Sequence, residues 1–93
     1  MGNAFGPREW KLDTAGTITV DKVRVRKMEW IPNAAGDDLL VSNSAGDVIW
    51  EVTNALAGAL AGAERIDFGD RGHEVEGFVL TTIGGGVLYV WVI

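Results

Sequence analysis

Hydrolytic chemistry in this chain would have to use a single histidine. His73 is the only one among the 93 residues, and the groups that would accompany it belong to Ser42, Ser44 and Asp70. A serine hydrolase places a serine hydroxyl within hydrogen-bond reach of a histidine that a carboxylate orients. Neither serine lies in the glycine-flanked turn that exposes such a nucleophile, and the chain has no cysteine to replace it. The sequence therefore predicts a protein that is not an enzyme.

Acidic residues surround His73 in the sequence and leave two interpretations open. Oxygen ligands from one loop can hold Ca²⁺, but the order of these residues does not match the helix–loop–helix calcium motif. A solvated acidic loop is therefore favoured over a cation site, and we expect no metal and no cofactor. The glycines at 84–86 lack the lysine and following helix of a phosphate-binding loop, so they predict a hairpin turn. The acidic residues are Asp67, Asp70, Glu74 and Glu76.

The composition is that of one folded domain. Ninety-three residues supply one hydrophobic core, and 47% hydrophobic residues with four tryptophans exclude intrinsic disorder. The net charge of −5 argues against general binding to nucleic acid. The uncharged stretch at 53–63 is too short to span a bilayer, and the one at 77–93 is interrupted by threonines and glycines. We therefore expect neither nucleic acid nor a membrane as a partner, and residues 1–7 do not have the pattern of a signal peptide.

The charges are distributed unevenly along the chain. Residues 1–30 carry six basic and four acidic side chains, a net of +2, whereas residues 31–93 carry two basic and nine acidic ones, a net of −7. The basic excess lies in Lys22, Arg24, Arg26 and Lys27. Two interpretations are open: a solvated strand face paired with nearby carboxylates, or a docking patch for an acidic partner. Under the second, reversal of Arg24 and Arg26 to Glu would slow association without unfolding the protein.

Alternating apolar residues predict short β-strands throughout the chain. The alternation changes phase near 21–22 and near 26–27, which predicts two β-bulges because a slip of one residue exchanges the faces of a strand. Residues 38–42 and 48–52 flank a turn with Gly46 and predict a hairpin. For 54–62, one short helical turn and an extended loop both remain open. The fold class is thus all-β: a single-domain antiparallel β-sandwich or jelly roll of about seven short strands.

Three apolar features favour contact with other molecules. The last strand, 87–93, is apolar on both faces, so Tyr89 and Trp91 lie either in the centre of the sheet or against another subunit. We expect a homo-oligomer, most simply a trimer. The arm at 1–7 is expected to become ordered only against something else, with Phe5 packed on a neighbour. The main domain is expected to span 8–93.

The four tryptophans, Trp10, Trp30, Trp50 and Trp91, are many for this length. Core or subunit-interface positions are favoured because each side chain buries a large area. A sugar-binding platform is the alternative, and it would be favoured if Trp10 and Trp50 were exposed and coplanar.

Four segments carry a resemblance to small all-β virion proteins of tailed bacteriophages. They are REWKLD at 8–13, MEWI at 28–31, AGDVIWE at 45–51 and GVLYVWV at 86–92. The similarity covers 8–93, and it extends to capsid decoration (cement) proteins, which are compact β-sandwiches or jelly rolls and often trimeric. The resemblance implies a non-enzymatic structural protein on the outer surface of the virion that stabilises the phage head at capsomer junctions, with the major capsid protein as its partner.

The arm, the basic block and the last strand predict the partner-binding residues, which are Phe5, Lys22, Arg24, Arg26, Lys27, Tyr89 and Trp91. A carbohydrate- or receptor-binding β-sandwich, such as a fibre or tail module, is the alternative function.

Overall fold

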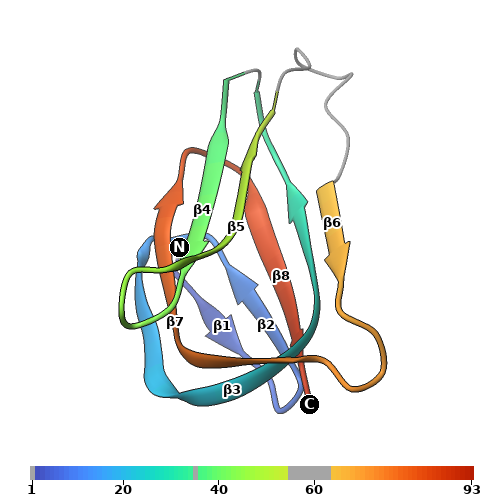
Figure 1. The fold of residues 1–93 in the computed structure, drawn as a ribbon. Coiled ribbons are helices and arrows are strands. Elements are labelled where there is room, and N and C mark those ends of the chain that lie inside the picture. Colours follow the sequence, from blue (N-terminus) through green and yellow to red (C-terminus); the bar gives the residue numbers. More distant parts are fainter. Residues whose placement is uncertain (1, 35, 55–63) are drawn as a thin grey trace.

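The chain folds as one antiparallel sheet of eight strands (Figure 1). The computed structural model describes residues 2–34, 36–54 and 64–93, and no helix occurs in these ranges. The predicted all-β antiparallel fold is confirmed, whereas the helical turn considered for 54–62 lies, apart from Asn54, outside the described residues. The described part also has no helix able to cross a membrane. The strands are β1 (Ala4–Phe5), β2 (Glu9–Leu12), β3 (Gly16–Ile31), β4 (Asp38–Ser42), β5 (Val48–Thr53), β6 (Glu64–Asp67), β7 (His73–Ile83) and β8 (Val87–Val92).

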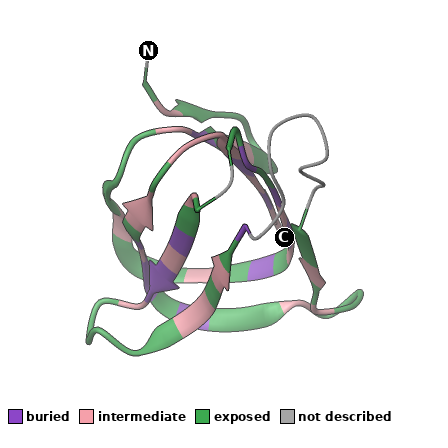
Figure 2. Cartoon of the chain, turned by 90° about the horizontal axis from the view of Figure 1, so that it is seen from above, coloured by how far each residue is buried: buried purple, intermediate pink, exposed green. Residues whose placement is uncertain are grey.

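The sheet curls around one interior, so that distant strands face each other across a shared core (Figure 2). The strand order is β1-β2-β8-β3-β7-β4-β5, and β6 also pairs with β3. Trp30 is the largest fully buried side chain, and its indole Nε1–H donates a hydrogen bond to the carbonyl of Gly85 at 2.9 Å. The buried core consists of Leu12, Val25, Met28, Trp30, Leu39, Val41, Val75, Phe78, Leu80, Leu88 and Val90.

Strand β3 is the common neighbour of three other strands. β8 pairs with its C-terminal half on one edge, while β7 and β6 follow one another along the opposite edge. The pairing register shifts between Thr19 and Lys22 against β7, and between Val25 and Lys27 against β8. These irregularities confirm the two predicted bulges, and bulges increase the bend and twist of a strand. The bend therefore allows β3 to pair with strands in both halves of the curled sheet.

The glycines at 84–86 do not form the predicted hairpin turn. β7 lies between β3 and β4, whereas β8 lies between β2 and β3, so the glycines connect strands on opposite sides of β3. Because β3 bends, β7 and β8 run in opposite directions although each is antiparallel to its own part of β3 (Figure 1). The turn residues suit both connections equally well, which is why the local sequence was misleading.

The hairpin of β4 and β5 is confirmed. Val41 pairs with Trp50, and Gly46 has φ of +90° in the connecting turn. The Asn43 side-chain oxygen accepts hydrogen bonds from the backbone N–H groups of Ala45 and Asp47 at 3.0 and 2.9 Å. This is the local pattern by which asparagine stabilises turns.

The N-terminal arm is ordered by its own chain, contrary to expectation. β1 pairs with β2, and the Asn3 side-chain oxygen accepts hydrogen bonds from the backbone N–H groups of Asp13 and Thr14 at 2.9 and 3.0 Å. Phe5 contacts Trp10 edge-to-face at 5.9 Å and remains 57% exposed. The sequence concealed this pairing because a two-residue strand has no alternation to detect.

Substitution of Gly86 should test the connection over β3. Gly46 and Gly86 both have positive φ, but only at Gly86 would a Cβ overlap other atoms, namely the carbonyl of Ile31. We expect Gly46→Ala to lower the free energy of unfolding by about 1–2 kcal/mol through backbone strain. Gly86→Ala should cost about 1–3 kcal/mol more through the overlap, as measured by urea unfolding. Equal losses for the two variants would contradict the close approach.

Candidate functional site

The groups considered for hydrolysis lie apart. Ser42 is buried on β4, where its hydroxyl accepts a hydrogen bond from Thr81, and its Cα partner on β7 is Val79. His73 begins β7 six residues earlier, roughly 20 Å along a strand. The His73 ring stacks on Phe68 with 5.1 Å between centroids. The arrangement therefore does not bring Ser42 into contact with His73, and the backbone N–H of Ser44 donates to the carbonyl of Glu76 at 2.9 Å.

The acidic residues around His73 contact cations and backbone groups of this chain. Asp67 accepts a hydrogen bond from the backbone N–H of Gly69 at 2.7 Å, and Glu74 and Glu76 face basic side chains of β3. In the ranges that the structure describes, no group of three or more potential ligands is placed to hold a metal ion.

Half of the basic block is paired within the sheet. Lys22 lies opposite Glu76 in the β3–β7 register, with Nζ 3.4 Å from Oε1. Arg24 lies opposite Glu74, 3.2 Å from its carboxylate, and also donates a hydrogen bond to the carbonyl of Arg71 at 3.0 Å. For Lys22 and Arg24, the interpretation as a paired strand face therefore describes the structure. Exposed pairs of this kind contribute only about 0–1 kcal/mol each.

The other half projects from the second bulge. Val25 and Met28 are buried, while Arg26 between them is exposed and Lys27 is half-buried on the outer surface. Two successive side chains thus leave the same face of β3, as the phase slip predicted. Lys27 Nζ lies 4.7 Å from the centre of the Trp91 ring, within the range of a cation–π interaction. The Arg26 guanidinium is 3.9 Å from Asp70, whose side chain is fully exposed.

The outer face of β8 carries two aromatic side chains. Leu88 and Val90 point into the core, while Tyr89 and Trp91 are half-buried on the opposite face. Their ring centroids are 6.1 Å apart and the planes are tilted by 30°. The strand is central, between β2 and β3, as one of the two predicted alternatives required. Its outer face nevertheless stays partly open to solvent.

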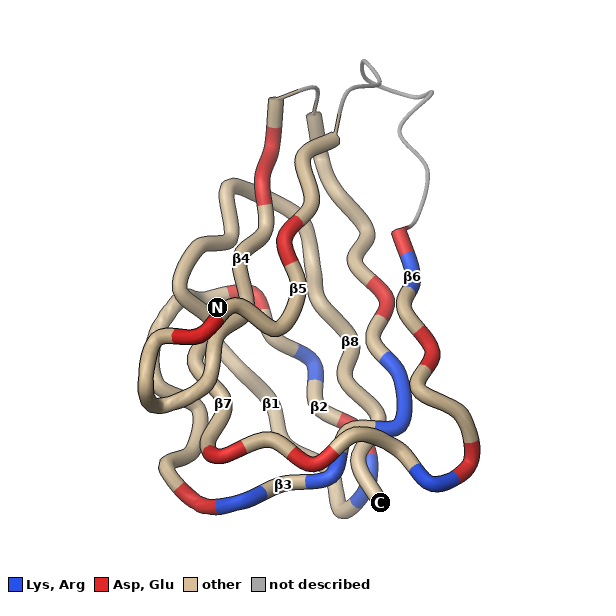
Figure 3. Tube along the Cα trace, viewed as in Figure 1, with Lys and Arg blue, Asp and Glu red and all other residues tan. Residues whose placement is uncertain are grey.

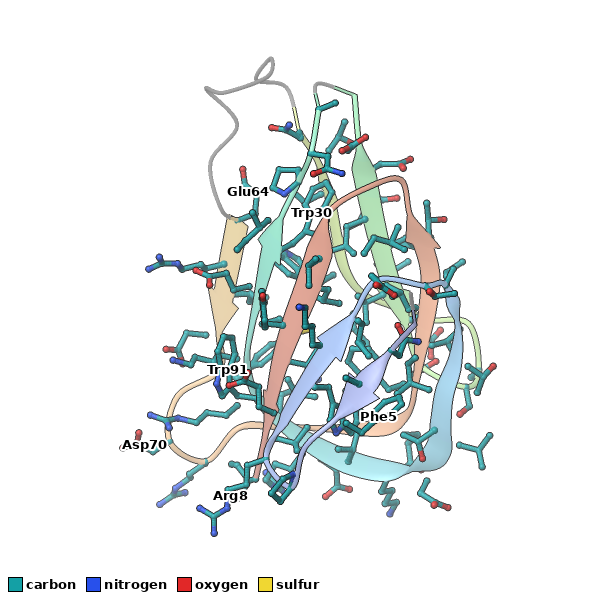
Figure 4. All side chains as sticks on the ribbon, turned by 180° about the vertical axis from the view of Figure 1, so that it is seen from behind. Phe5, Arg8, Trp30, Glu64, Asp70 and Trp91 are labelled. Carbon is teal, nitrogen blue, oxygen red and sulfur yellow. The ribbon has the colours of Figure 1, made fainter. Side chains whose placement is uncertain are left out.

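Trp91 separates two surface hollows of similar size. One hollow, of about 350 Å³, is lined by Lys27, Met28, Glu29, Arg65, Ile66, Asp67 and Trp91. The other, of about 370 Å³, is lined by Arg8, Arg26, Asp70, Trp91, Val92 and Ile93. We call them the Arg65 hollow and the Arg8 hollow. Figure 4 shows Arg8, Asp70 and Trp91 at the same end of the molecule.

The two hollows differ in charge. In the Arg65 hollow two cations face two carboxylates, and Arg65 Nε is 2.6 Å from the Glu29 carboxylate. In the Arg8 hollow two arginine side chains face one acidic side chain, that of Asp70. Basic and acidic positions are interspersed at this end of the molecule (Figure 3). The Arg8 hollow therefore has one basic side chain more than acidic ones, although the chain has a net charge of −5.

The structure brings some predicted site residues together and separates others. Arg26, Lys27, Tyr89 and Trp91 share the outer surface of β3 and β8, whereas Phe5 contacts Trp10, whose ring also contacts Phe78 in the core at 5.5 Å. The sequence analysis missed Arg8 and Arg65. Their proximity to Trp91 follows from long-range pairing of β2 with β8 and of β6 with β3, for which no local signal exists.

Comparison with known protein families, curated protein sequences and solved structures gives no match for this chain. The fold and the surface define an all-β domain with an aromatic and basic outer face on β3 and β8.

Charge reversal should distinguish the paired from the projecting half of the basic block. Arg24→Glu places like charges directly opposite each other on β3 and β7, so we expect a loss of up to about 1 kcal/mol in the free energy of unfolding. Arg26→Glu disturbs only a distant, exposed pair and should cost less than about half as much. Urea unfolding at low salt measures both. A larger loss for Arg26→Glu would contradict the assignment, and the single variant is a cleaner test of binding than the double reversal.

Proposed function

We propose that the chain is a non-enzymatic virion structural protein of the capsid decoration (cement) type, bound to the major capsid protein on the outer surface of a phage head. The proposal unites the sequence resemblance with one observation, the partly open surface around Tyr89 and Trp91. Interface cores are enriched in aromatic residues and arginine. Trp91 between Arg8, Arg26 and Lys27 has this composition.

The charge distribution supports docking on an acidic surface. Lys22 and Arg24 are paired within the sheet, whereas Arg26 has only a 3.9 Å contact and Lys27 lies over a ring. Cations held beside an aromatic anchor would orient the approach to carboxylates and raise the association rate. Repeated sites on a capsid would add avidity to a small domain.

Binding to capsids that lack decoration tests the proposal. We expect the protein to sediment with them, and its affinity to fall as salt rises from about 0.05 to 0.5 M because the screening length shortens to a few ångströms. Trp91→Thr should weaken binding about tenfold or more, as expected for an aromatic hot spot. Val48→Thr is the control, since Val48 is 59% exposed and is not among the residues lining either hollow. Failure of the unaltered protein to bind would refute the proposal.

We further propose that the protein acts as a homotrimer on the particle. Exposed apolar side chains, among them Val20 at 73% and Ile93 at 61%, support contact between copies. We expect copies to occur in groups of three in particle reconstructions. A stable monomer in sedimentation of the free protein, together with isolated single copies on the particle, would exclude the trimer.

A carbohydrate- or receptor-binding module is the second candidate, and one observation favours it. Tyr89 and Trp91 form a half-buried pair tilted by 30° whose solvent-facing side could stack on a sugar ring. Trp10 and Trp50, which the sequence suggested as a sugar-binding platform, do not form one, because both are half-buried and pack against the core. Tight, Trp91-dependent binding on a glycan array, without capsid binding, would place this candidate first.

A further inference from the structure

We infer that the Arg8 hollow is a binding site for a glutamate side chain of an acidic peptide segment. This inference deepens the proposed docking function and rests on it. It names which of the two hollows takes the partner and which chemical group enters.

The walls of the hollow are fixed by backbone hydrogen bonds. The carbonyl of Arg8 accepts a bond from the Val92 N–H at 2.9 Å, which fastens the start of β2 to the end of β8. The Ile93 N–H donates to the carbonyl of Arg24 at 2.9 Å, which fastens the same end of β8 to β3. The two arginines that line the hollow thus come from segments held on either side of one strand.

The bulge in β3 places one basic side chain in each of the two hollows that Trp91 lines. Lys27 lines the Arg65 hollow and lies over the Trp91 ring, while Arg26 lines the Arg8 hollow. Val25 pairs with Val92 and Lys27 with Trp91, so Arg26 is the extra residue of the bulge. Arg26 and Lys27 therefore both lie on the outer face, between the buried Val25 and Met28. The bulge therefore supplies the second guanidinium of the Arg8 hollow.

The charge balance selects this hollow for an anion. Two guanidinium groups favour a carboxylate because their planar N–H groups match its two oxygens. The carboxylate already present, Asp70, is fully exposed and 3.9 Å from Arg26, so it holds Arg26 weakly. An incoming carboxylate would replace this contact. In the Arg65 hollow, the 2.6 Å pair of Arg65 with Glu29 leaves no comparable excess of positive charge.

The apolar lining favours glutamate on a peptide. The side chains of Trp91, Val92 and Ile93 form the apolar part of the wall, against which the methylene groups of a glutamate side chain can pack. A polyanion such as single-stranded nucleic acid would extend beyond the hollow over a chain with a net charge of −5.

Titration of the full chain with a short peptide tests the inference. The probe is acetyl-Gly-Glu-Leu-Glu-Gly-amide, with the corresponding Gln peptide as control, followed by NMR of the Trp91 indole and arginine side-chain N–H signals. Arg26→Gln should weaken binding about fivefold or more, the size expected for a charge-assisted hydrogen bond. Arg24→Gln removes the same charge from a paired site on the same strand and should change affinity less than about twofold.

Asp70→Asn is expected to change the affinity for the peptide in the opposite direction. Removing the competing carboxylate should tighten binding about two- to threefold, whereas Asp21→Asn, the same change at another exposed position, should leave it nearly unchanged. Weakening by Asp70→Asn would contradict the inference.

Several results would overturn the glutamate site. They are equal binding of the Glu and Gln peptides, equal effects of Arg24→Gln and Arg26→Gln, shifts confined to the Arg65 hollow, or tighter binding of a single-stranded oligonucleotide. Capsid binding is measured separately with the same variants. If capsids bind the unaltered protein and Arg26→Gln equally while the peptide does not bind, the glutamate site is refuted and the proposed function stands. Peptide binding without capsid binding would refute the proposed function and retain the site.

Discussion

The bend of β3 is the constraint on which the rest of this fold depends. A 16-residue strand carries β8 on one edge and β7 and β6 on the other, and a straight strand of that length would hold all three in one open sheet. The bulges let the two halves of β3 belong to opposing parts of a curled sheet. Trp30 lies fully buried in the C-terminal half of β3, and burial of a tryptophan contributes roughly 4–6 kcal/mol at most from its apolar area.

The same bulge connects the fold to the candidate surface. It reverses the face on which side chains lie, so Val25 and Met28 remain in the core although they are three positions apart. The two residues between them must then leave on the outer face together. The bulge that keeps Val25 and Met28 in the core thus also places Arg26 and Lys27 on the outer face beside Trp91. Substitutions that straighten the strand would alter both the core and the surface.

The sequence was informative where a feature depends on neighbouring residues. Slips in apolar alternation predicted the bulges, and the Asn43–Asp47 turn with Gly46 predicted the hairpin of β4 and β5. It was uninformative where a feature depends on pairing between distant strands. The glycines at 84–86 fit a hairpin as well as a connection across β3, and the contact of Arg8 with the Trp91 surface requires the pairing of β2 with β8.

The sequence also could not predict which face of the last strand points into the core. Every residue of β8 is apolar or aromatic, so alternation of polarity could not tell which face points inward. The structure places Leu88 and Val90 in the core and leaves Tyr89 and Trp91 half-open. The predicted central position and the predicted interface are therefore compatible, because the two faces of one strand have different surroundings.

Pairing of carboxylates with only part of the basic block explains why an acidic chain still has basic side chains beside Trp91. The carboxylates Glu74 and Glu76 lie beside Lys22 and Arg24 along the β3–β7 pairing, where register holds opposite charges within contact distance. Beyond the bulge, β7 no longer runs beside β3, and β6 supplies Asp67 and Arg65 in its place. Glu74 thus lies opposite Arg24 and Asp67 opposite Lys27, whereas Arg26 between them contacts the exposed Asp70 at 3.9 Å. Since charges at physiological ionic strength act over about 8 Å, these neighbouring side chains, rather than the net charge, determine the electrostatic surroundings of Trp91.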